Sequence, residues 1–169
     1  MSDSTYSMMA YVCTNDGTCE KTDSTSIEGN EEENLSWKAL SQTQTYKIWS
    51  GYAFESLCLK HISQIKKALG ISGIQSSVNS FLHRKDTFYN KGFQIDMLID
   101  RADGIINICE MKFYADEFTI NPDYAKKLRT KREGLKAVSK TKSNVNITFV
   151  TSYGITDNTQ KIDLVENDL

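Results

Sequence analysis

Two strand-like runs joined by a short turn, between Gly92 and Lys112, constrain the fold more than any other part of the chain. In both runs apolar residues alternate with polar ones, which is typical of strands that pair as a hairpin. The first run carries Asp96, and the second carries Glu110 and Lys112. Because side chains two residues apart share a face of a strand, we expect Glu110 and Lys112 to point together.

The position of Asp96 relative to Glu110 depends on the turn. A two-residue loop at Asp103-Gly104 would pair Asp96 with Met111 and leave the carboxylates on opposite faces. A three-residue loop that ends with Gly104 in the left-handed conformation would instead place Asp96 opposite Glu110. Opposed residues have Cβ atoms about 4.5 to 5.5 Å apart, so only this second register lets two carboxylates share a hard cation such as Mg²⁺.

Charge is distributed unevenly along the 169 residues. The net charge is −7 in residues 1–35, +8 in residues 36–156 and −3 in residues 157–169. A basic body suits a domain that binds phosphate groups, although basic helices are usually just solvated. The first segment lacks hydrophobic periodicity and is predicted to be a disordered acidic leader, and the last is predicted to be an acidic C-terminal tail.

The composition indicates one globular domain with reduced cysteines. Its 39% hydrophobic content can form a core, and four cysteines with two histidines include no C-x-x-C pair that would indicate a zinc site. No apolar run is long enough to span a membrane, and the first residues lack the features of a signal peptide. We therefore expect a cytoplasmic protein with no membrane partner.

Hydrophobic spacing predicts the element order helix, strand, strand, strand, helix, strand. Apolar residues three or four apart indicate a first helix over residues 51–69, which Gly70 ends. Beyond the hairpin, Pro122 and the capping residue Asn121 begin a second helix that extends to about Lys140. A strand is predicted over residues 74–84, and an interior strand is predicted over residues 145–151. The second helix is rich in lysine and arginine, which fits either a solvated face or contact with a sugar-phosphate backbone.

With these elements in order, the chain resembles the PD-(D/E)XK phosphodiesterase superfamily. It is most similar to the nuclease-like domain often found at the C-terminal end of prokaryotic AAA-type ATPases, and the resemblance covers about residues 37–152. The matching segments are Gly51-Tyr52-Ala53-Phe54-Glu55, Gln94-Ile95-Asp96 and Glu110-Met111-Lys112. An E-x-K motif alone is weakly specific, but here it lies one hairpin after an aspartate and downstream of a helix that carries a glutamate. The resemblance implies a three-layer α/β/α, restriction-endonuclease-like fold with a mixed four-stranded sheet.

The resemblance also implies a role for each matching residue. Glu55, Asp96 and Glu110 match the acids that bind Mg²⁺ or Mn²⁺, and Lys112 matches the lysine near the attacked phosphate, so these four are the candidate catalytic residues. The further site residues are Gln94 as an accessory group and Tyr124, Lys127, Lys131 and Arg132 as nucleic-acid contacts. The sequence has Ile95 where the family name has proline, and it has no G-x-x-x-x-G-K-[ST] phosphate loop. The chain would therefore be free-standing, a fragment, or the partner of a separate ATPase.

These observations predict metal-dependent phosphodiester hydrolysis of DNA. The alternative is a catalytically silent DNA-binding or regulatory module associated with an AAA-type ATPase, and a third reading is a structural dimerisation domain. The expected partners are DNA and a separate or fused ATPase, and a homodimer is compatible with the sequence. In the ordinary alternative, Asp96, Glu110 and Lys112 form a solvated hairpin face with a surface ion pair, and Glu55 is an exposed helix acid.

Overall fold

The computed structural model describes residues 11–13, 19–21 and 37–169, and the chain divides into two units, residues 1–41 and 42–169. In the first unit β1 (Tyr11–Cys13) pairs antiparallel with β2 (Cys19–Lys21), and α1 (Trp37–Gln42) ends at the boundary between the units. The rest of the expected acidic leader lies outside the described residues.

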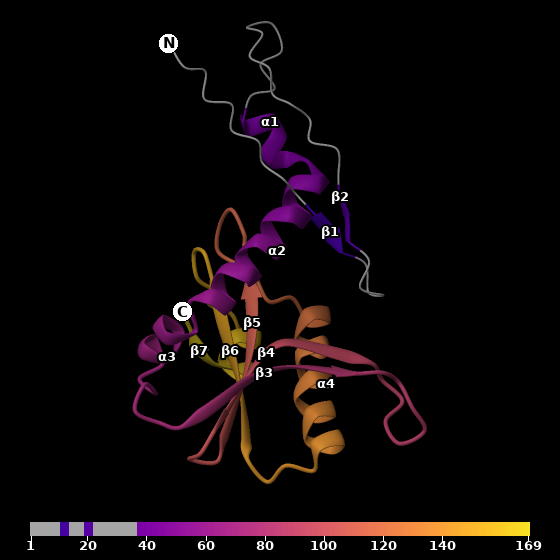
Figure 1. Ribbon diagram of the computed structural model, residues 1–169, viewed down its shortest axis with the longest axis vertical. Helices are drawn as coiled ribbons and strands as arrows, with labels where there is room; N and C mark the ends of the chain where they lie inside the picture. The colour runs from indigo at the N-terminus through magenta and orange to yellow at the C-terminus, as the bar shows by residue number, and fades with distance from the viewer. Residues whose placement is uncertain (1–10, 14–18, 22–36) are drawn as a thin grey trace, which may run out of the picture. The chain divides into compact units, whose positions relative to one another are not determined.

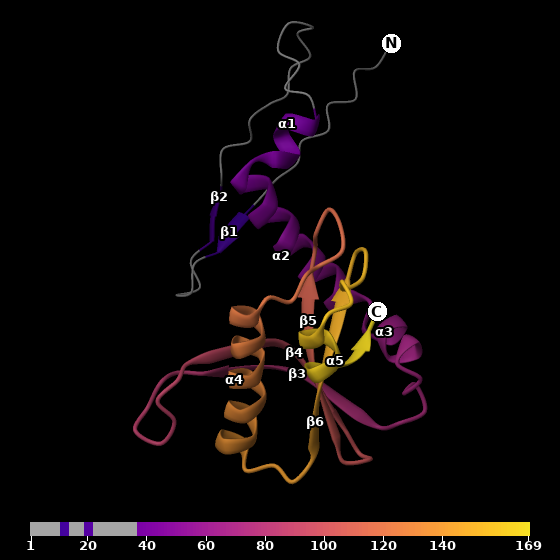
Figure 2. The same cartoon turned by 180° about the vertical axis from the view of Figure 1, so that it is seen from behind.

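The second unit is a mixed five-stranded sheet with helices on both faces (Figures 1 and 2). Its strands, in order across the sheet, are β3 (Ser76–His83), β4 (Phe93–Arg101), β5 (Ile105–Lys112), β6 (Asn144–Thr151) and β7 (Val165–Asp168). Pairing is antiparallel from β3 to β5 and parallel from β5 to β7. The helices are α2 (Gln44–Lys60) and α3 (Ile62–Ala68) on one face, and α4 (Pro122–Ser139) and α5 (Thr159–Leu164) on the other. The predicted α/β class is therefore confirmed.

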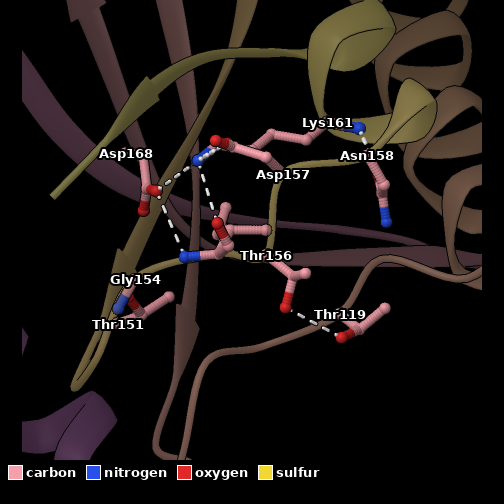
Figure 3. Close-up of polar contacts among 9 residues, drawn as sticks. Thr119, Thr151, Gly154, Thr156, Asp157, Asn158, Lys161 and Asp168 are labelled. Carbon is pink, nitrogen blue, oxygen red and sulfur yellow. Dashed lines mark hydrogen bonds and ion pairs between the residues drawn. The ribbon is translucent and has the colours of Figure 1, made fainter.

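The sheet has five strands rather than the expected four because β7 lies within residues 157–169, which were expected to form a tail. Lys161 Nζ of α5 connects the loop before this helix to β7. It contacts Asp157 Oδ1 at 2.9 Å, Asp168 Oδ2 at 3.1 Å and the carbonyl oxygen of Ile155 at 2.9 Å (Figure 3). Leu164 is 2% exposed and attaches α5 to the core. The hydrophobic pattern missed this strand because it is only four residues long and rich in charge.

The residues predicted as one helix, 51–69, belong to two helices, α2 and α3, and the first of them begins earlier, at Gln44. The Thr43 hydroxyl accepts the backbone N–H of Tyr46 at 3.2 Å and thereby caps α2 ahead of Gln44. The backbone of His61 leaves the helical conformation, with φ −110° and ψ 29°, and α3 follows. Cys58 and Ile65 pack into the same core cluster on either side of this break, so apolar periodicity alone could not reveal it.

The hairpin has the register of a three-residue loop over residues 97–100 and 106–109. Its loop is residues 102–104 with Gly104 at φ 81°, and Met97 pairs with Cys109 while Asp100 pairs with Ile106. The three-residue loop is confirmed. The predicted start of α4 is also confirmed, because Pro122 occupies the first turn and the Asn121 side chain accepts the N–H of Tyr124 at 2.8 Å. No helix in residues 37–169 or in the other described segments is long and apolar enough to cross a membrane.

Helix α4 approaches β4 closely at a glycine. A Cβ atom built on Gly134 would lie 2.5 Å from Cε1 of Phe93, which is closer than any real carbon contact. Phe93 is buried between Phe81, Tyr89 and the helix, so its ring has little space to move. Glycine at position 134 therefore sets how near the lysine-bearing helix lies to the sheet.

We predict that Gly134→Ala destabilises the protein. Overpacking costs about 1 to 3 kcal/mol, whereas the helix-propensity gain of alanine over glycine is about 1 kcal/mol. The free energy of unfolding, measured by urea denaturation, should fall. Gly73→Ala is the matched control, since a Cβ there meets nothing within 4 Å. An unchanged or higher stability of Gly134→Ala would contradict the close packing.

Candidate active site

The Glu110 carboxylate lies at the centre of the candidate site. This residue is 2% exposed, and its Oε2 accepts a hydrogen bond from the Tyr124 hydroxyl at 2.8 Å. Oε1 accepts a hydrogen bond from Lys131 Nζ, and Lys112 Nζ lies 4.0 Å from Oε2. A buried carboxylate needs such partners, because an unpaired charge in the protein interior lowers the stability of the fold by on the order of several kcal/mol.

Side chains of β5 alternate between the two faces of the sheet, which explains why α4 supplies the partners of Glu110. Cys109 and Met111 pack with Cys58 and Ile65 of α2 and α3, so Glu110 between them projects toward α4. Tyr124 and Lys131 are seven residues apart on α4, which places both on one face of the helix. Lys112, two residues beyond Glu110, has its Nζ 5.7 Å from the centroid of the Tyr124 ring. Side chains of β5 and α4 therefore approach the same carboxylate, that of Glu110.

Asp96 lies at an irregularity in β4. Phe81 pairs with Ile95 but Asn79 pairs with Leu98, so β4 has one more residue than β3 in this interval. Such bulges redirect side chains and are frequent beside active sites. The Gln94 side chain donates a hydrogen bond to Asp96 Oδ1 at 2.8 Å. The β4–β5 pairs run from Asp100–Ile106 to Met97–Cys109 and end one residue before Asp96 and Glu110.

Glu55 comes to the same place from α2. Burial raises the pKa of its carboxyl group above the usual value, and the negative charges of Asp96 and Glu110 raise the pKa further. The positive charges of Lys112 and Lys131 lower the pKa of Glu55 and offset part of this effect. The charges of Asp96, Glu110, Lys112 and Lys131 therefore all act on Glu55, although these groups come from β4, β5 and α4.

Tyr124 remains a neutral hydrogen-bond donor in this setting. Burial raises the pKa of its hydroxyl strongly, and the charge of Glu110 and the hydrogen bond donated to that residue raise the pKa further. Asp96 and Glu55 act on the Tyr124 pKa in the same direction. The phenol therefore orients Glu110 but does not serve as a base.

The donor set fits a hard divalent cation that keeps part of its water. Mg²⁺ is commonly bound by one or two carboxylates plus water and phosphate oxygens, and Asp96 and Glu110 are two such carboxylates on paired strands. Within the described residues no three acidic, histidine or cysteine side chains form a set that could hold a metal ion. Glu55 thus lies within electrostatic range of the pair without completing a three-ligand cluster.

A basic groove lies beside the carboxylates. Its volume is about 670 Å³, and it is lined by Gly92, Phe93, Asp123, Lys126, Lys127, Thr130 and Lys131. Lys126 and Lys127 are exposed, and Lys131 belongs to both the groove and the Glu110 cluster. Arg132 lies apart from the groove lining and pairs with Glu166 of β7, with 3.8 Å between Nη1 and Oε1.

Of the nine predicted site residues, the structure brings Lys112, Tyr124 and Lys131 to Glu110 and bonds Gln94 to Asp96. Glu55 lies within electrostatic range of Asp96 and Glu110. Lys127 lines the adjoining groove, and Arg132 is directed to β7. Sequence reasoning assigned Tyr124 and Lys131 to nucleic acid and missed their bonds to Glu110. Their seven-residue spacing was the signal that both share a helix face.

Comparison of the chain with family models, with curated proteins and with solved structures gave no match. The resemblance to PD-(D/E)XK nucleases therefore stays a prediction from the motif residues of the sequence.

We predict that Glu55→Gln stabilises the metal-free protein at pH 7. The folded-state pKa of Glu55 is raised above 4.5, so the folded protein binds this proton more tightly than the unfolded chain does. The wild type therefore loses stability as pH rises from the unfolded pKa through the folded one, and the glutamine variant does not. Urea denaturation with a chelator should give the variant a higher free energy of unfolding than the wild type at pH 7.

Below about pH 4 the two proteins should converge, because Glu55 is then neutral in both states. Glu117→Gln, a change at an exposed loop acid, serves as the control and should not alter this pH profile. An unchanged or lower stability of Glu55→Gln at pH 7 would contradict a Glu55 pKa that burial and the charges of Asp96 and Glu110 raise.

Proposed function

We propose that the chain is a metal-dependent DNA nuclease of the PD-(D/E)XK type, with a restriction-endonuclease-like fold. The observation that carries this proposal is the convergence of Glu55, Asp96 and Glu110 with Lys112. These residues come from a helix and two strands, and Glu55 is separated from Asp96 by the whole of α3 and β3. A solvated hairpin face would not bury Glu110 to 2% exposure, give it two hydrogen-bond donors from α4 and place the Lys112 ammonium group nearby.

The proposed roles follow from the chemistry of each group. Asp96 and Glu110 would hold Mg²⁺ or Mn²⁺, with Glu55 adding negative charge nearby. Such an ion, when bound, acts as a Lewis acid and lowers the pKa of its water. Lys112 would stabilise the negative charge that develops on the phosphoryl oxygens. Tyr124 holds Glu110 in place, and Gln94 does the same for Asp96.

The basic groove supports DNA as the substrate. Lys126 and Lys127 line it from exposed positions of α4, and Lys131 connects it to Glu110. Lysine contacts with phosphate position a nucleic acid without reading its sequence. Motif similarity to a domain that accompanies AAA-type ATPases further supports a separate or fused ATPase as partner.

One observation favours a second candidate, a catalytically silent DNA-binding or regulatory module. Both oxygens of Glu110 already accept hydrogen bonds, from Tyr124 and Lys131, and the described residues contain no three-ligand metal set. A domain that had lost its metal could retain such an ion pair as a structural contact. Metal binding therefore distinguishes the two candidates.

We predict cleavage of plasmid or branched DNA by the purified protein in Mg²⁺ or Mn²⁺. Asp96→Ala should abolish it because a metal ligand is lost, and Lys112→Ala should lower the rate about 100-fold or more because charge stabilisation is lost. Asp100→Asn, an exposed acid of the same strand, is the matched control and should cleave like the wild type. Equal cleavage by all four proteins would indicate a contaminating nuclease.

Calorimetric titration with Mn²⁺ separates the two candidates without measuring turnover. The nuclease proposal expects binding by the wild type and loss of binding in Asp96→Ala. Tight DNA binding by a wild type that takes up no Mn²⁺ would favour the silent module.

A further inference from the structure

Lys131 belongs to two sites at once. Its ammonium group donates to Glu110 Oε1, and its side chain also lines the basic groove with Lys126 and Lys127. It is one-fifth exposed, so the groove gives it access to solvent. A lysine side chain has a flexible four-carbon stem, so its charge can move between the carboxylate and the groove without moving the helix.

The two oxygens of Glu110 are held differently. Tyr124 and the more distant Lys112 lie on Oε2, and Lys131 binds Oε1. In residues 37–169 no other hydrogen bond to Oε1 is present. If Lys131 left, the carboxylate would keep the phenol and the Lys112 charge, and Oε1 would be free for another cation.

A divalent cation at Oε1 would compete directly with the Lys131 ammonium group. Both are positive and need the same oxygen, and their mutual repulsion at short range disfavours joint occupancy. The divalent ion makes the stronger interaction and would displace Lys131. The groove is then the accessible position for the released ammonium, where a phosphate group of DNA could bind it.

We propose that Lys131 is an internal counter-ion that a bound metal displaces into the groove, so that metal binding and DNA binding strengthen one another. This inference rests on the metal-binding and DNA-binding parts of the proposed function and does not require turnover. By linkage the coupling is reciprocal, and each ligand raises the affinity for the other by the same factor.

The test compares the wild type with Lys131→Met and Lys127→Met. Lys127 lines the same groove but has no bond to Glu110, which makes it the matched control. Mn²⁺ affinity is measured by calorimetry without DNA. Affinity for a short fluorescein-labelled duplex is measured by anisotropy with and without Mn²⁺, and a denaturing gel verifies that the duplex is intact.

We expect Lys131→Met to bind Mn²⁺ about tenfold more tightly than the wild type, since the competing charge is gone. In the wild type Mn²⁺ should raise DNA affinity at least about fivefold, and this gain should shrink in Lys131→Met. Lys127→Met should keep the wild-type Mn²⁺ affinity. Its DNA affinity should be lowered by the same factor with and without Mn²⁺, so Mn²⁺ should raise it as much as in the wild type. Lys131→Arg retains the charge, so its Mn²⁺ affinity should stay closer to that of the wild type than to that of Lys131→Met.

Equal or weaker Mn²⁺ binding by Lys131→Met would overturn the inference. If the wild type nevertheless binds Mn²⁺ and cleaves DNA, the proposed function survives and only the counter-ion role fails. If neither protein binds Mn²⁺, the metal part of the proposed function fails with it.

A second measurement uses the wild type alone and does not depend on a variant that folds. Amine acetylation read by mass spectrometry should increase at Lys131 when Mn²⁺ is added, because the ammonium is released from Glu110. Lys127 should react equally in both conditions. Unchanged reactivity of Lys131 with Mn²⁺ bound would contradict the displacement.

Discussion

The contact on which the site depends is the set of hydrogen bonds at the buried Glu110 carboxylate. A carboxylate with 2% exposure in the middle of an α/β layer must be compensated, and Tyr124, Lys131 and Lys112 provide the compensation. These bonds fix α4 against β5, and Gly134 permits the close approach of the same helix to β4. The geometry of the acidic cluster and the position of the basic groove therefore have one structural origin.

Part of this arrangement was readable from the sequence. The three-residue loop that ends in glycine and the Asn121-Pro122 start of α4 each reflect local backbone preferences, and both are found in the structure. The uninterrupted alternation expected for β4 is wrong, because Phe93 and Ile95 pack on the α4 side of the sheet whereas Met97 and Ile99 pack on the α2 side. The register of the pairs from Asp100–Ile106 to Met97–Cys109 followed from the loop length alone. Glu55 could be located only through the motif resemblance, because its position depends on how α2 packs on the sheet.

Other features depend on tertiary contacts that leave no local pattern. The break at His61 interrupts a helix whose apolar stripe continues on both sides. The strand β7 is short and acidic, and its place in the sheet depends on parallel pairing with β6 and on the Lys161 contacts with Asp157 and Asp168. The bond from Lys131 to Glu110 joins residues 21 apart in the sequence and needs the helix to be docked.

The order in which these contacts can form has a consequence for the folding chain. The hairpin that carries Asp96 and Glu110 is local and can close within microseconds. Tyr124 lies 14 residues beyond Glu110, and Glu55 reaches the cluster only after α3 and β3 have been placed between it and β4. Loop-closure entropy makes such long-range steps slower than local ones. An incompletely folded molecule therefore holds two acids without the helices that orient them, and the full set of contacts at Glu110 is a property of the finished domain.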